Sequence, residues 1–169
     1  MHSLATVIDL PSYRKVIAPK FPRSRDLPYF ILFWSLQFGL ARWMVENHIN
    51  DQVQFVFDDY SGFGRRAAAL HPKMLGDLPP EASAILKLPP RFAHDKTEPA
   101  LKAADLFAWH VQRDVNTMVK AGALWTQNMR TKPFAKMMEI PPLGQLLEEK
   151  ELEALLPIIE AAKAQGMIP

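Results

Sequence analysis

The chain has 169 residues, of which 49% are hydrophobic and 22% are charged, and its formal net charge is +2. This length and composition predict one globular domain with a sizeable core, and so small a net charge gives no argument for a nucleic-acid partner. No Cys is present, which excludes disulfides, thiolate zinc sites and cysteine nucleophiles. Without a recognisable signal peptide or a bilayer-length apolar run, we expect a cytoplasmic protein with no membrane partner.

Apolar patterning predicts strands and helices in alternation along the chain. The expected elements are a strand at 4–10, an extended basic loop at 11–27, a buried helix from about 27 to 47, a strand at 52–57, a helix at 65–75, a helical turn at 81–86, a strand at 88–93 and a helix at 99–114. This alternation is typical of an α/β sheet covered by helices. We expect that domain to span 1–121, with 122–169 as a helical extension that is acidic over 143–165.

The helix expected at 99–114 carries an acid among apolar residues. At 100° per residue, Asp105 falls within a broad arc that also holds Phe107, Val111 and Trp109. A buried carboxylate is costly unless it is paired, hydrogen-bonded or bound to a metal. The sequence therefore predicts that Asp105 has a partner elsewhere in the chain.

Three other acids follow the predicted strands. Asp58 and Asp59 end one strand, and Asp95 ends the next. Functional groups of α/β sheets gather at such strand ends, so these acids and Asp105 are candidate ligands of Mg²⁺ or Mn²⁺, as in phosphoryl-transfer enzymes. The alternative is that the strand-end acids cap helices or bond turn amides, and that Asp105 pairs with a buried Arg or a backbone amide.

Several basic residues are candidate phosphate contacts. They are Arg65 and Arg66 at a helix start, Lys96 beside Asp95, and Arg23 and Arg25 in the basic loop. Each could equally belong to a solvated surface. His94 is a candidate general base or ligand, although a solvated loop His is the more common case. His2, His48 and His71 have no motif around them.

Two stretches, FVFDDYSGFGRRA and HDKTEPALKAADLFAWHVQRD, resemble the family called domain of unknown function 3800 (DUF3800). Its members have an apolar strand that ends in an acid, a further strand that leads to an acid-containing turn, and a helix with a Gln/Lys-Ala-Ala-Asp-Leu segment. The similarity covers roughly 4–116. It implies a ribonuclease H-like mixed sheet flanked by helices, with Asp58, Asp95 and Asp105 as catalytic acids around Mg²⁺ or Mn²⁺ and Asp59 as a further metal ligand.

One feature of that family is missing from the sequence. Members begin with a strand that ends in Asp-Glu-Ser-Gly, whereas LATVIDL resembles their third strand, so we expect an N-terminally incomplete version of the fold. Two hypotheses follow: a metal-dependent nuclease or related phosphodiester hydrolase, or a non-catalytic member that binds nucleic acid or protein. An exposed sheet edge would also favour self-association by strand pairing.

Overall fold

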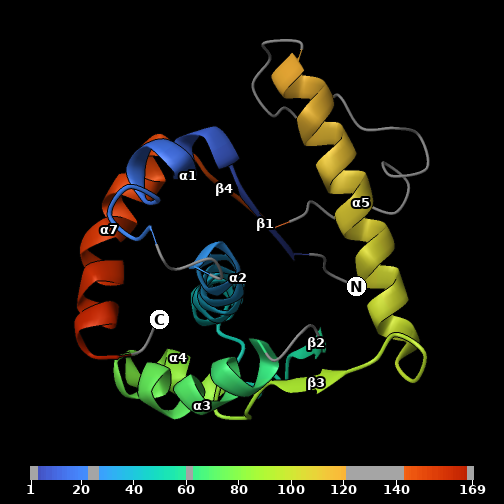
Figure 1. Ribbon diagram of the computed structural model, residues 1–169. Helices are drawn as coiled ribbons and strands as arrows, with labels where there is room; N and C mark the ends of the chain where they lie inside the picture. The colour runs from blue at the N-terminus through green and yellow to red at the C-terminus, as the bar shows by residue number, and fades with distance from the viewer. Residues whose placement is uncertain (1–3, 23–26, 60–62, 121–142, 167–169) are drawn as a thin grey trace.

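The computed structural model of the chain describes residues 4–22, 27–59, 63–120 and 143–166. The elements in chain order are β1 (Leu4–Ile8), α1 (Leu10–Val16), α2 (Leu27–Glu46), β2 (Val56–Asp58), α3 (Phe63–Gly76), α4 (Pro80–Ile85), β3 (Arg91–Ala93), α5 (Pro99–Lys120), β4 (Leu143–Leu147) and α7 (Glu149–Ala164). In Figure 1, α2 lies near the centre, with α7 and α5 on opposite sides of it. The α/β class expected from the sequence is confirmed.

The described strands form two separate parallel pairs. β1 pairs with β4 from Leu4 opposite Leu143 to Ile8 opposite Leu147, and β2 pairs with β3. Parallel pairing follows from the alternation of strands and helices, because parallel neighbours need a long connection between them. Among the described residues, β1 and β2 each pair along one edge only. Self-association through an open edge stays a prediction.

Helix α2 supplies the centre of the main core. Its side chains Leu27, Phe30, Ile31 and Phe33 are buried, in agreement with the buried helix that we expected at 27–47. Gln37 is also buried, and its side-chain amide donates a hydrogen bond of 3.2 Å to the carbonyl oxygen of Phe33, which satisfies one of its polar atoms. Other buried residues of this core come from α1, α3, α4, β4 and α7.

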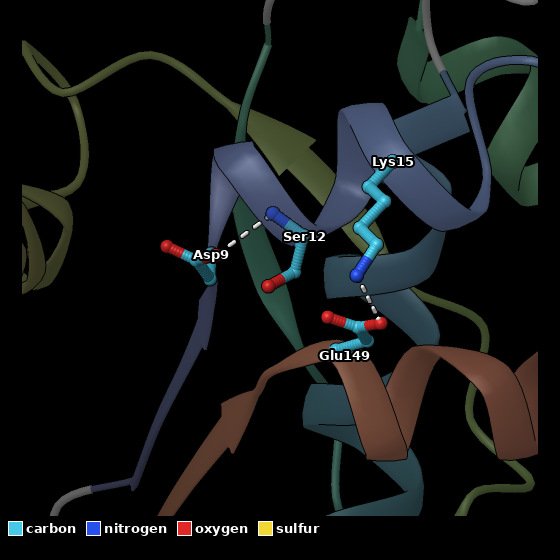
Figure 2. A network of polar contacts seen from close by, with 4 residues as sticks. All are labelled: Asp9, Ser12, Lys15 and Glu149. Carbon is cyan, nitrogen blue, oxygen red and sulfur yellow. Dashed lines mark hydrogen bonds and ion pairs between the residues drawn. The ribbon is translucent and has the colours of Figure 1, made fainter.

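The expected loop at 11–27 is wrong over its first residues, because Leu10–Val16 forms α1. Proline is tolerated in the first turn of a helix, where its missing N–H has no partner to lose. Asp9 caps this helix by accepting a hydrogen bond of 2.8 Å from the backbone N–H of Ser12 (Figure 2). Figure 2 also shows Lys15 of α1 in a 2.6 Å ion pair with Glu149 at the start of α7.

The C-terminal segment is not a purely helical extension. Residues Leu143–Leu147 form β4, which pairs with β1, and only Glu149–Ala164 is helical. Leu147, Leu152 and Ile159 are buried in the same core as α2. The helix-like apolar spacing of this segment is overridden at its start by the parallel partner β1, since strand formation depends on tertiary pairing more than on local pattern.

The two strands next to the candidate site are shorter than expected. β2 is Val56–Asp58 rather than 52–57, and β3 is Arg91–Ala93 rather than 88–93. β3 begins directly after Pro89 and Pro90, which have no N–H to donate to a strand partner. The helices predicted at 65–75 and 81–86 are confirmed as α3 and α4, within two residues at their ends.

Helix α5 is held to β1 by a small, separate cluster. Val111 is buried there, and Phe107 and Val115 of α5 pack with Ala5 and Val7 of β1. Because β1 contributes only two small side chains, the contact between β1 and α5 covers a narrow strip of the helix. Most of the remaining surface of α5 faces away from the main core.

Candidate functional site

Strands β2 and β3 bring two of the predicted acidic positions to the same end of their sheet. Asp58 lies opposite Ala93 in the register, and the backbone N–H of Asp59 donates a 3.0 Å hydrogen bond to the carbonyl oxygen of Ala93. Asp95 follows two residues after Ala93. The ends of β2 and β3 that precede these acids therefore lie side by side.

The turn after β3 is held by its own hydrogen bonds. The carbonyl oxygen of His94 accepts from the backbone N–H groups of Thr97 and Glu98 and from the Thr97 hydroxyl, at 3.0 to 3.1 Å. Glu98 also forms a 2.6 Å ion pair with Arg91. These contacts fix the chain between β3 and α5 without using the carboxylate of Asp95.

The carboxylates of Asp58, Asp59 and Asp95 have no hydrogen bond or ion pair within the part of the chain that the structure describes. Asp58 and Asp59 are exposed and Asp95 is half-buried. The alternative interpretation expects the strand-end acids to cap helices or to bond turn amides. Within the described residues, none of the three carboxylates does so.

The prediction that Asp105 is buried is wrong, because its side chain is exposed on α5. The apolar arc on the helical wheel is wider than the strip that β1 covers, and the exposed part of the arc includes Trp109 as well as Asp105. Within the described ranges, no three acids or histidines are placed so that together they could hold a metal ion. The structure thus places Asp58, Asp59 and the turn that holds Asp95 at the same end of the β2–β3 pair, and leaves Asp105 exposed on α5.

The predicted phosphate contacts are surface residues where the structure describes them. Arg65 and Arg66 are exposed in the first turn of α3, and Lys96 is exposed beside Asp95 in the turn after β3. The first-turn position is suitable for an anion because backbone N–H groups are unpaired there. Arg23 and Arg25 lie outside the described residues.

The buried acid of α5 is Asp114, which is not among the predicted site residues. Its exposed fraction is 6%, and its Oδ2 atom has no hydrogen-bond partner among the described residues. Arg113 Nε lies 3.8 Å from Oδ1. The spacing contained this signal, since Asp114 comes three residues after Val111 and seven after Phe107 on the face that packs against β1.

His71 is a second buried polar residue without a sequence motif. It is 3% exposed on α3, and neither ring nitrogen makes a hydrogen bond of good geometry within the described part of the chain. Burial lowers its pKa from 6.5, and the nearby backbone of Leu86 opposes that shift without cancelling it. Its position four residues after the buried Ala67 and three before the buried Met74 was the available signal.

Trp109, His110 and Arg113 form a contact group on α5. The guanidinium carbon of Arg113 lies 4.6 Å from the centre of the Trp109 ring, and Nη2 of Arg113 lies 3.2 Å from Nδ1 of His110. The rings of Trp109 and His110 meet edge to face at 4.9 Å. A surface hollow of about 370 Å³ adjoins this group, lined by Trp109, Gln112, Arg113, Asn116 and Thr117.

Comparison with known proteins adds no assignment, because no family model, no curated protein and no solved structure matches the chain. The similarity to the DUF3800 family, and the ribonuclease H-like fold that it implies, therefore stay predictions from the sequence. Among the described helices, none is long and apolar enough to cross a membrane.

Proposed function

We propose that the chain is a divalent-metal-dependent nuclease or related phosphodiester hydrolase with a ribonuclease H-like arrangement. Asp58 and Asp95 would hold Mg²⁺ or Mn²⁺, and Asp59 is the next residue of the chain after Asp58. The observation that carries the proposal is the parallel register of β2 and β3, because Asp58 opposite Ala93 brings the acids of both strands to one end of the sheet.

The donor set fits a hard cation. Mg²⁺ is commonly bound through one or two carboxylates, with water and substrate phosphate oxygens completing its coordination. A pair of carboxylates, from Asp58 at the end of β2 and Asp95 in the turn after β3, would meet this requirement without a further acid. Neighbouring carboxylates also repel one another, and a bound cation offsets that repulsion.

The proposed roles follow from the positions of the residues. The bound cation would polarise the phosphodiester and activate water for an in-line displacement. Arg65 and Arg66 at the start of α3, and Lys96 beside Asp95, would bind the phosphates of the substrate strand. Asp105 lies on the outer side of α5, so the catalytic role that the family resemblance implies for it stays a prediction.

A second candidate function is favoured by one observation. Asp105 is exposed, so its carboxylate needs neither a metal nor a buried partner, which suits a non-catalytic protein that binds nucleic acid or protein. The two candidates differ in whether the strand-end acids bind a metal.

Calorimetric titration with Mn²⁺ tests the proposed metal site. We expect the wild-type chain to bind Mn²⁺ and Asp58→Asn to bind it more than roughly tenfold more weakly. Loss of the hydrogen bonds that orient a metal ligand lowers metal affinity by about 10- to 100-fold, and loss of the ligand itself should lower it at least as much. Asp105→Ala measures the contribution of α5. Asp51→Asn is the matched control, because Asp51 is an exposed acid before β2, at the opposite end of the strand from Asp58. Equal binding by Asp58→Asn and wild type, or no binding by either, would contradict the proposal.

A further inference from the structure

The outer face of α5 presents a row of polar and aromatic side chains at helical spacing. Its members are Lys102, Asp105, Trp109, Gln112, Arg113 and Asn116. Steps of three and four residues place them on one side of the helix, away from Val111 and the other side chains that pack against β1. Trp109 is 53% exposed although it is the largest side chain of this row.

Trp109 and Arg113 are held in place by one another. The guanidinium carbon lies over the indole at 4.6 Å from its centre, and Nη2 of the same group lies 3.2 Å from His110 Nδ1. Ordering two long side chains on a surface costs conformational entropy. Here both side chains are already ordered in the folded chain before any ligand binds. A ligand that stacks on Trp109 would therefore meet a surface that is already arranged.

The hollow beside these residues has the functional groups that recognise unpaired nucleotides. An aromatic ring stacks on a base of any identity, an arginine contacts phosphate, and the amides of Gln112 and Asn116 can donate to and accept from base edges. Its volume of about 370 Å³ lies within the range of roughly 300–1,000 Å³ that is usual for ligand sites. Bases within a duplex cannot reach such a surface.

We propose that this face of α5 binds the single-stranded nucleic acid that the chain cleaves, with the strand running from Asp105 toward Asn116. This inference rests on the proposed nuclease function and names its substrate class. At 1.5 Å per residue, Trp109 lies about 6 Å and Asn116 about 16 Å along the helix from Asp105. That length accommodates about five nucleotides at the 3.4 Å spacing of a stacked strand. A phosphate near Asp105 would thus have its neighbouring bases beside Trp109 and Arg113.

Fluorescence anisotropy with a labelled oligothymidylate tests this binding face. The titration is made in EDTA so that neither metal binding nor cleavage contributes. We expect Trp109→Ala to weaken binding by roughly tenfold, because stacking of one base contributes about 1–3 kcal/mol, and Trp109→Phe to retain much of the affinity. Arg113→Ala should lower the slope of log K against log salt by about one.

Tyr29→Ala is the matched control, since Tyr29 is an equally exposed aromatic residue on α2. Binding that Trp109→Ala weakens and Tyr29→Ala leaves unchanged supports the proposal, whether or not the wild type cleaves the strand with Mn²⁺. The proposal is overturned if the wild type does not bind, if Trp109→Ala binds normally, or if the corresponding duplex or an acidic peptide binds as tightly. Failure of the nuclease function alone would appear as normal binding without cleavage.

Discussion

Replacing Gly64 with alanine would place a methyl group against the ring of Phe92. An ideal Cβ at this position lies 2.6 Å from Phe92 Cγ and 2.7 Å from Cδ1. These atoms belong to a ring that stacks with Phe57 at 5.8 Å and with Phe33 at 6.4 Å. The ring cannot move without disturbing the contact between α2, β2 and β3, so Gly64 is what lets α3 approach the strands that carry the candidate site.

The magnitude follows from two opposing effects. Overpacking of this kind costs about 1–3 kcal/mol, and the short Cβ distances favour the upper part of that range. Alanine recovers up to about 1 kcal/mol of helix propensity relative to glycine. We therefore expect Gly64→Ala to lower the free energy of unfolding by about 1–2 kcal/mol.

Urea denaturation followed by circular dichroism measures this change. Gly39→Ala is the matched control, because Gly39 lies inside α2 and nothing is within 4 Å of an added Cβ, so this variant should gain about 1 kcal/mol. Adding Phe92→Leu to Gly64→Ala should recover part of the loss. A Gly64→Ala variant as stable as the wild type, or more stable, would refute the proposed close packing of α3 on β3.

Three further predictions concern individual residues. Burial lowers the pKa of His71 below the 6.5 of the unfolded chain. The contribution of neutral His71 to stability is therefore present above about pH 6.5 and is lost as pH falls. On acidification the urea midpoint should fall less for His71→Leu than for the wild type, and equal falls would show that His71 does not titrate in this way. Asp9→Ala should cost about 1 kcal/mol of unfolding free energy because Asp9 caps α1, whereas Asp9→Ser should cost little; equal losses would argue against the cap. His48 has a φ of 58° after α2, so His48→Gly should raise the thermal midpoint, and a lower midpoint would contradict a strained backbone there.

The helices that can be predicted from the sequence are those whose apolar residues face a large core. Phe30, Ile31 and Phe33 fill a broad side of α2, so periodicity alone predicted that helix and its approximate ends. Helix α1 was missed because Pro11 and Pro19 resembled loop punctuation. The stabilising contact is the bond from Ser12 to Asp9, which depends on the local geometry of the first turn.

The candidate site could be predicted only in part. Acids that follow strands are visible in the sequence, and parallel pairing of β2 with β3 brings Asp58 and the turn holding Asp95 to one sheet end. The burial of Asp105 could not be decided in this way, because its helix packs on Ala5 and Val7, more than ninety positions earlier in the chain. A helical wheel shows that Asp114 shares a side with Val111 and Phe107, but only the partner strand β1 determines that this side is covered and that Asp105 is not.

The most direct test of the central proposal is metal-dependent cleavage of a labelled single-stranded oligonucleotide by the wild type and by Asp58→Asn. We predict that the wild type cleaves the strand with Mn²⁺, that EDTA stops the reaction, and that Asp58→Asn is slower by at least about a hundredfold, as expected when several kcal/mol of charge stabilisation by the metal is lost. Absence of cleavage by the wild type, or equal rates for the two proteins, would contradict a metal-dependent hydrolase built on the ends of β2 and β3.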